Sequence, residues 1–202
     1  MQHPDWPAFL AAIVADPDDD TARLVAADFL DENGDPDRAA FIRIQVELAR
    51  LEATGQGKSL EVDYLRAKER AFLGPLSMYR QLWAAEACPE LVRVVSRGGG
   101  RDPLEAMTVE GADRVTWRRG FVEELMCSTE VWLRHGETVR QRNPVHSVFL
   151  TECDRMTRDN WYAGMAGLTG LRSVRLVDAV PGTAPWLQGW LPGSEVVEGI
   201  PF

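Results

Sequence analysis

In the second half of the chain, apolar residues recur in one fixed frame: an apolar position, a second apolar position three residues later, and a third two residues after that. Successive copies begin 23, 26 and 26 residues apart, which lies inside the window of roughly 20–29 residues for leucine-rich-type repeats. Such units stack into a solenoid whose strands line one face, and that face commonly binds a partner. The copies are Val122-Leu125-Cys127, Val145-Val148-Leu150, Leu171-Val174-Leu176 and, more weakly, Val197-Ile200-Phe202.

The first 90 positions follow a helical period instead, with apolar residues three and four positions apart. Five helices are expected, the first beginning after Asp5 and Pro7 and the second near position 20. The others pass through residues 41–51, 60–72 and 77–87, and turns rich in Asp, Gly and Pro separate them. In the second helix four apolar residues are expected to face the core, namely Leu24, Val25, Phe29 and Leu30.

The order of residues in this helical half resembles a known bacterial module. Segments 9–13, 16–19, 23–32 and 40–48, together with Gly34-Asp35, are similar to the repeat-companion domain. That domain is a short helical module at the N-terminus of many proteins of planctomycete-type bacteria, often ahead of leucine-rich-like repeats. The resemblance implies a helical module followed by repeats, and it implies no activity.

Two later segments of the chain are similar to the usual continuation in such proteins, namely Phe72-Leu73-Gly74-Pro75-Leu76 and Arg119-Gly120-Phe121-Val122-Glu123. The chain departs from the family pattern at two positions. Phe29 stands where tryptophan is usual, and Ala26 stands where an aromatic residue is common. Both departures change packing only, so they leave the implied architecture intact.

The fold class predicted is α+β, with an N-terminal helical module packed on a short irregular leucine-rich-repeat-like sheet with intervening helices. Residues 1–57 form the acidic helical module, residues 58–120 a helical linker and an irregular capping junction with a hairpin, and residues 121–202 the repeat units. A helix over 129–142 is expected between the first two repeat strands, with Val131, Trp132 and Val139 facing inward.

The charge of the chain argues against nucleic acid and anionic membranes as partners. The net charge is −9; residues 1–57 carry 12 acidic and 4 basic side chains, and the rest is nearly neutral. Phosphate contacts need a basic surface, which this chain does not offer as a whole. Nucleic-acid contact remains a weaker alternative, because residues 114–142 contain six arginines and only four acidic residues. The arginines considered for it are Arg114, Arg118, Arg119, Arg140 and Arg142.

The rest of the composition predicts a cytoplasmic protein. No run approaches the ~18 apolar residues of a membrane helix, and the N-terminus lacks the pattern of a secretory signal. Cys88, Cys127 and Cys153 include no C-x-x-C spacing. They therefore indicate neither a disulfide framework nor a zinc site, and a reducing cytoplasm suits them best.

The residues with reactive or metal-ligating side chains give no catalytic set, and no cofactor is predicted. Gly98-Gly99-Gly100 lacks the Lys of a phosphate loop, and the three histidines lack metal-ligand spacing. Asp28, Asp31 and Glu32 lie within about one helical turn and could hold a hard cation. Alternatively, Asp28 pairs with Arg23 or Arg43. A metal-dependent enzyme or regulator using these acids is thus the competing hypothesis.

The leading hypothesis is a non-catalytic protein–protein interaction module, an adaptor or accessory subunit of a larger assembly. Neighbouring side chains on a strand point to opposite faces. If the repeat positions face the core, the partner-binding surface consists of Glu124, Met126, Ser147, Phe149, Thr151, Ser173, Arg175 and Val177. Met126, Phe149 and Val177 are expected to form an exposed apolar row, which suggests a protein partner. Alternatively, the segment 186–190 covers this face.

Overall fold

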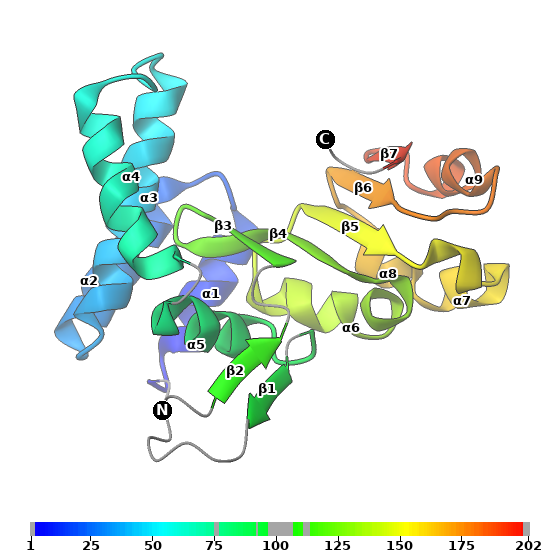
Figure 1. Ribbon diagram of the computed structural model, residues 1–202, viewed down its shortest axis with the longest axis horizontal. Coiled ribbons are helices and arrows are strands. Elements are labelled where there is room, and N and C mark those ends of the chain that lie inside the picture. The colour runs from blue at the N-terminus through cyan, green and yellow to red at the C-terminus, as the bar shows by residue number, and fades with distance from the viewer. Residues whose placement is uncertain (1–2, 75–76, 92, 97–106, 111–113, 200–202) are drawn as a thin grey trace.

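The fold consists of a helical half followed by a sheet that helices cover on one side (Figure 1). This computed structural model describes residues 3–74, 77–91, 93–96, 107–110 and 114–199. Its class is α+β, as the sequence predicts. The main sheet has the strand order β3-β4-β5-β6-β7, and a two-stranded sheet is separate from it. No helix of the described ranges is long and apolar enough to cross a membrane.

Five helices build the N-terminal half close to the expected positions. Their starts follow from local capping, since the side chains of Asp19, Asp35, Ser59 and Ser77 each accept a hydrogen bond from a backbone N–H of the helix they precede. Pro36 opens the longest of them, where its missing N–H costs nothing. The helices are α1 (Trp6–Ala15), α2 (Asp20–Glu32), α3 (Pro36–Ala53), α4 (Leu60–Leu73) and α5 (Met78–Ala87).

The buried side of α2 differs from the prediction. Leu24 and Val25 are 39% and 49% exposed, whereas Arg23, Ala26 and Ala27 are fully buried. Small alanine side chains let α2 lie close to its neighbours, and Arg23 is buried because it finds polar partners there. Hydrophobicity alone therefore assigned the wrong face to the middle of this helix.

The register of the main sheet confirms the repeat frame for its first three copies. β4 (Phe121–Ser128), β5 (Ser147–Thr151), β6 (Ser173–Leu176) and β7 (Glu195–Glu198) run parallel to one another. Leu125 aligns with Val148 and then with Val174, and Cys127 aligns with Leu150 and then with Leu176. All six side chains are buried in one core.

The fourth repeat was misplaced by the sequence pattern. Val196 aligns with the buried Val174, whereas Val197 aligns with Arg175 on the other face. The expected copy began at Val197 and continued to Ile200 and Phe202, which lie outside the described residues. The expected copy placed Ile200 opposite Val174, four residues beyond Val196, and it assigned Val197 to the core, whereas Val197 lies on the face opposite the helices.

One face of the sheet carries all the helices of the repeat region (Figure 1). They are α6 (Thr129–Arg142), α7 (Arg158–Ala163), α8 (Met165–Leu168) and α9 (Thr183–Trp190), with a 3-10 turn, η2, at Cys153–Arg155. Trp132 and Val139 of α6 are fully buried, as predicted, and Val131 is half-buried. Leu187 of α9 belongs to the same core. The segment 186–190 therefore lies on the helical side and does not cover the open face.

The junction between the two halves contains the expected hairpin pairing. β1 (Arg93–Ser96) and β2 (Met107–Glu110) are antiparallel, while the glycine run at 98–100 lies outside the described residues. β3 (Val115–Arg118) pairs antiparallel with β4 and occupies the edge of the first repeat strand. It thus caps that end of the stack, which terminal repeats require.

The turn between β3 and β4 docks the sheet on the helical half. Gln45 donates to the Trp117 carbonyl (3.2 Å) and accepts from the Gly120 N–H (2.7 Å). Gly120 has φ +86°, and a β-carbon there would stand 2.8 Å from the Cα of Ile42 in α3. Only glycine fits so close an approach of two backbones with this φ. The turn is therefore fixed against α3, next to the face of the sheet that lies opposite the helices.

Candidate functional site

The candidate site is the face of the sheet opposite the helices. All eight residues predicted for partner binding are half-buried or exposed, and none belongs to the core clusters. The parallel register arranges them in two rows across the strands. One row is Glu124-Ser147-Ser173-Glu195, and the other is Met126-Phe149-Arg175-Val197.

The apolar row differs from the prediction at its third strand. Arg175, and not Val177, aligns with Phe149. Val177 follows the end of β6, and its N–H donates to the Leu150 carbonyl at 2.8 Å. One further step of the register therefore places Val177 opposite Thr151. The repeat frame already aligns Arg175 with Phe149, 26 residues earlier, and Val177 was expected in the row only because it is apolar.

The side chains in the apolar row contact one another. The Arg175 guanidinium lies 5.1 Å from the centre of the Phe149 ring, a cation–π contact. Met126, on the other side of Phe149, is 38% exposed. Phe149 is thus partly covered by a charged side chain, while Met126 is open to solvent.

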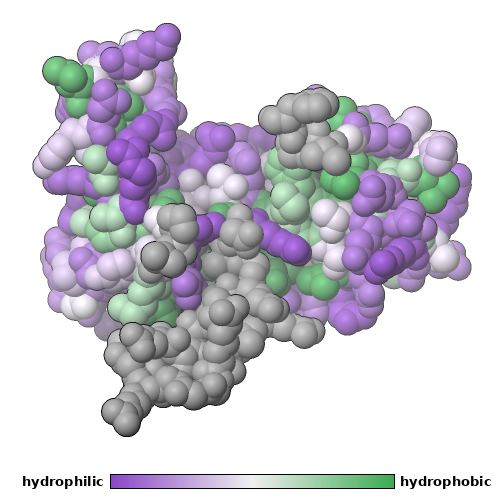
Figure 2. All heavy atoms as spheres, viewed as in Figure 1, coloured by the Kyte–Doolittle hydropathy of each residue, from purple (hydrophilic) through white to green (hydrophobic). Residues whose placement is uncertain are grey.

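A hollow of about 700 Å³ adjoins this face at the foot of the α3–α4 hairpin. The hairpin rises beside the sheet in Figure 1, and the surface between them in Figure 2 is indented and largely hydrophilic. Glu124 belongs both to the hollow and to the open face, and its carboxylate lies 3.2 Å from Arg118. The other polar residues of the hollow include Gln45, Glu52, Arg66, Glu69, Arg119 and Arg172.

A buried ion pair fixes the wall of this hollow. Arg23 of α2 and Glu123 of β4 are joined at 2.8 Å, with side chains 0% and 2% exposed. Arg119 and His146 also reach the Glu123 carboxylate, each at 3.1 Å. Arg23 further donates to the Pro17 and Arg119 carbonyls. The carboxylate therefore joins α2, the β3–β4 turn and the approach to β5.

The charged partners determine the protonation of Glu123. Burial alone would raise its pKa, but the hydrogen bond with His146 and the charges of Arg23 and Arg119 outweigh burial and lower the pKa. Burial lowers the pKa of Arg23, and the charge of Glu123 opposes that shift. Both groups stay charged near neutral pH, so the pair is an ion pair buried in the protein.

Sequence reasoning missed this network. Glu123 stands between Val122 and Glu124 with no local motif, and Arg23 lies 100 positions away in a helix. The one available signal was that Arg23 and Glu123 both fall inside segments that resemble the repeat-companion pattern. Their roles here are structural, because both are too buried to meet a partner directly.

The acidic cluster of α2 is bound by an arginine of α3. Arg43 contacts Asp28 at 2.7 Å and Asp31 at 3.0 Å, which matches the alternative in which Asp28 pairs with Arg43. Glu32 is exposed nearby. Within the described ranges, no group of three or more His, Cys, Asp or Glu side chains could hold a metal ion.

The cysteines are placed as core residues. All three are buried and free. Burial raises the pKa of Cys88 and that of Cys127 to about 12 in each case, so neither is a thiolate at neutral pH. Burial also raises the pKa of Cys153, which contacts the Thr129 hydroxyl.

The arginines considered for nucleic-acid contact are dispersed among protein partners. Arg119 contacts Asp18, Asp20 and Glu123. The others with partners are Arg118 with Glu124, Arg140 with the Gly167 and Thr169 carbonyls, and Arg142 with Glu90. Arg114 is exposed beside β3.

Comparison of the chain with protein-family models finds no matching family, and comparisons with curated proteins and with solved structures find no match either. The resemblance to the repeat-companion domain therefore stays a prediction.

Proposed function

We propose that the protein is a non-catalytic interaction module, an adaptor or accessory subunit that binds a protein partner on the open strand face. The observation that carries the proposal is the row of Met126, Phe149, Arg175 and Val197 on a face that no described helix covers. Methionine, aromatic and arginine side chains are enriched where protein interfaces are most buried. This row thus has the composition of an interface centre.

The surroundings of the row favour a protein partner over a small ligand. A polar row runs beside it and carries an acid on β4, Glu124, and another on the edge strand β7, Glu195. Glu124 then continues into the hollow beside α3 and α4, whose walls carry charges of both signs. An apolar centre with a polar rim is the usual arrangement of a protein interface.

The cytoplasm is the compartment that suits this proposal. Cys88, Cys127 and Cys153 are all free and buried. Free thiols in the core are compatible with a reducing compartment and gain nothing from an oxidising one.

The test is partner capture with a single substitution on the face. Phe149→Ala should weaken capture by about 1–3 kcal/mol, the range of a central anchor, and should leave the fold intact. Tagged wild-type and variant proteins are compared by quantitative pull-down from native cells, with cross-links mapped by mass spectrometry. Glu61→Ala is the matched control, because Glu61 is exposed on the far hairpin helix α4.

Two outcomes contradict the proposal. If capture and melting temperature are both unchanged in Phe149→Ala, the partner binds elsewhere, and the acidic helical head is then the next surface to test. If cross-links to the partner fall outside the open face and the adjoining hollow, the same conclusion follows.

A further inference from the structure

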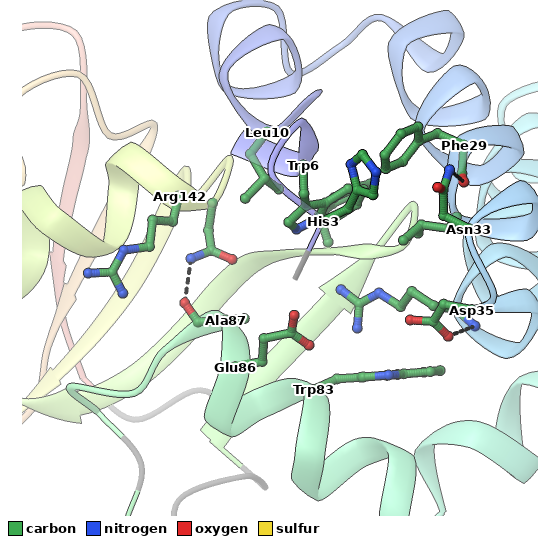
Figure 3. A pocket seen from close by; sticks show the side chains of 14 residues that line it. His3, Trp6, Leu10, Phe29, Asn33, Asp35, Trp83, Glu86, Ala87 and Arg142 are labelled. Atoms are coloured by element: carbon green, nitrogen blue, oxygen red, sulfur yellow. Dashed lines mark hydrogen bonds between the residues drawn. The ribbon is translucent and has the colours of Figure 1, made fainter. Parts of the chain in front are cut away.

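A second cavity, of about 740 Å³, lies on the helical side of the molecule and plays no part in the proposed interface. In Figure 3, His3, Trp6, Leu10 and Phe29 form one wall, and Trp83 and Glu86 lie across from them. Half of the lining residues are apolar and half are polar or charged, the charged ones being Asp35, Arg38, Glu86 and Arg142. A volume of this size is typical of small-molecule sites, which span roughly 300–1,000 Å³.

A buried cation lines this cavity. Arg38 of α3 is 8% exposed. Its guanidinium carbon lies 4.7 Å from the ring centre of Trp83 and 4.6 Å from that of Trp117. These two rings are inclined at 67° to each other, so the guanidinium sits in the corner between them. Burial lowers the pKa of Arg38 to about 10, and the group is still cationic at neutral pH.

The hydrogen bonding of Arg38 is incomplete. Its Nη2 donates to the Gly120 carbonyl at 3.2 Å. Its Nη1 is buried and has no hydrogen-bond partner among the described residues. A buried charged donor without an acceptor is destabilising, and such a group in a native protein calls for an explanation.

We propose that this cavity binds a small organic monocarboxylate with an apolar or aromatic body, whose carboxylate accepts a hydrogen bond from Arg38 Nη1. The carboxylate supplies the missing acceptor at Nη1. The apolar body then packs against Trp6, Leu10 and Phe29, the wall opposite Trp83. Arginine is suited to this role because its planar guanidinium matches the geometry of a carboxylate.

The charges around the cavity favour a ligand with a single negative charge, because the second lining cation, Arg142, is already paired with Glu90 at 2.7 Å. Asp35 and Glu86 line the cavity and are exposed to solvent, and both interact with the charge of Arg38. They would repel a second anionic group on the ligand. Inorganic phosphate and dicarboxylates should therefore bind more weakly than a monocarboxylate with an apolar body.

The test uses the full chain and needs no variant for its main comparison. 3-Phenylpropionate is titrated against the protein beside its neutral amide, 3-phenylpropionamide, and inorganic phosphate. Binding is measured by calorimetry and by the fluorescence of the tryptophans, since Trp6 and Trp83 line the cavity. The carboxylate should bind saturably, and the amide should bind about ten- to a hundredfold more weakly, the usual effect of a hydrogen bond to a charged group.

Variants then place the binding site. Arg38→Gln should abolish the preference for the carboxylate over the amide, while Arg43→Gln, which removes an exposed arginine of the same helix, should retain it. If Arg38→Gln does not fold, the side-chain N–H signals of Arg38 in the wild-type protein serve instead. These should shift on addition of 3-phenylpropionate and not on addition of the amide.

Three results would overturn the proposal. They are the absence of saturable binding of 3-phenylpropionate to the folded wild type, equal binding of the amide, and carboxylate binding that leaves the Arg38 signals unmoved. A tripeptide ending in phenylalanine is the remaining probe. Binding of that peptide more tightly than of 3-phenylpropionate would assign the cavity to the C-terminus of a protein chain and not to a small molecule.

Discussion

Arg23 and Glu123, 100 positions apart in the chain, form an ion pair of 2.8 Å that is almost wholly shielded from solvent. The pair joins a helix of the N-terminal half to the first repeat strand. Such a pair stabilises a particular arrangement of two elements because either charge alone would be costly in the interior. It therefore couples the helical half to the sheet that carries the proposed interface.

Removing one partner of this pair should be strongly destabilising. Arg23→Met or Glu123→Gln is expected to lower the free energy of unfolding by about 3–5 kcal/mol, because the remaining charge stays buried without its partner. The double variant should lose less than the sum of the two. Urea denaturation of the four proteins gives the coupling energy, and additive losses would contradict the direct pairing.

The matched control is an exposed pair of the same module. Arg43→Met and Asp28→Asn remove a contact of 2.7 Å between two solvent-exposed side chains. The loss there should be about 1 kcal/mol or less, because water and salt screen the interaction. A similar loss in both cycles would show that burial is not the source of the coupling.

Stability should depend on acid through Glu123. Its pKa in the folded protein is below the ordinary value of 4.5, so the unfolded chain binds the proton more readily. The contribution of this carboxylate is fully present above that ordinary value and is lost as the pH falls through the lower folded pKa. Urea denaturation of the wild type between about pH 6 and pH 3 should show this loss.

Glu123→Gln should flatten that acid dependence, while Glu61→Gln, at an exposed position, should not. The comparison isolates the Glu123 carboxylate, which contacts Arg23, Arg119 and His146. An acid profile of Glu123→Gln that is parallel to the wild type would contradict the lowered pKa.

Gly120→Ala should disrupt the docking of the β3–β4 turn. The new β-carbon would meet the backbone of Ile42 at 2.8 Å, and the φ of +86° already disfavours a side chain. We expect a loss of about 3 kcal/mol or more, from strain and overpacking together. Gly55→Ala has a similar φ of +76° with nothing within 4 Å, so it measures the backbone strain alone, about 1–2 kcal/mol. Equal melting temperatures of the two variants would argue against the close contact.

The strand register is tested by a charge at an inward position. Val148 is fully buried, so Val148→Asp should lower the free energy of unfolding by about 4 kcal/mol or prevent folding. Met126→Asp, on the open face of the adjacent strand, should change it by about 1 kcal/mol or less. The urea midpoints of the two variants measure both effects. A larger loss in Met126→Asp than in Val148→Asp would show that the open face has been assigned to the wrong side of the sheet.

The sequence alone determined the N-terminal helices, the helix over 129–142, the first three repeat strands and most of their faces. Helices begin where Asp19, Asp35, Ser59 and Ser77 cap them, and such caps act on neighbours within three positions. The repeat frame placed Leu125, Val148 and Val174 in the core for the same reason, since alternation along a strand is a local property.

Only the tertiary structure decided which residues meet. The contact of the Arg175 guanidinium with the Phe149 ring depends on how two neighbouring strands pack, which the repeat frame does not specify. The burial of Arg23 and of Arg38 depends on Glu123 and Gly120, which lie 100 and 82 positions away. A charged side chain is read from sequence as exposed, and it becomes a core residue only where the fold brings it a partner. Pairs of residues this far apart in the chain hold the helical half against the sheet and form the cavity beside Arg38. No local sequence pattern predicts such pairs.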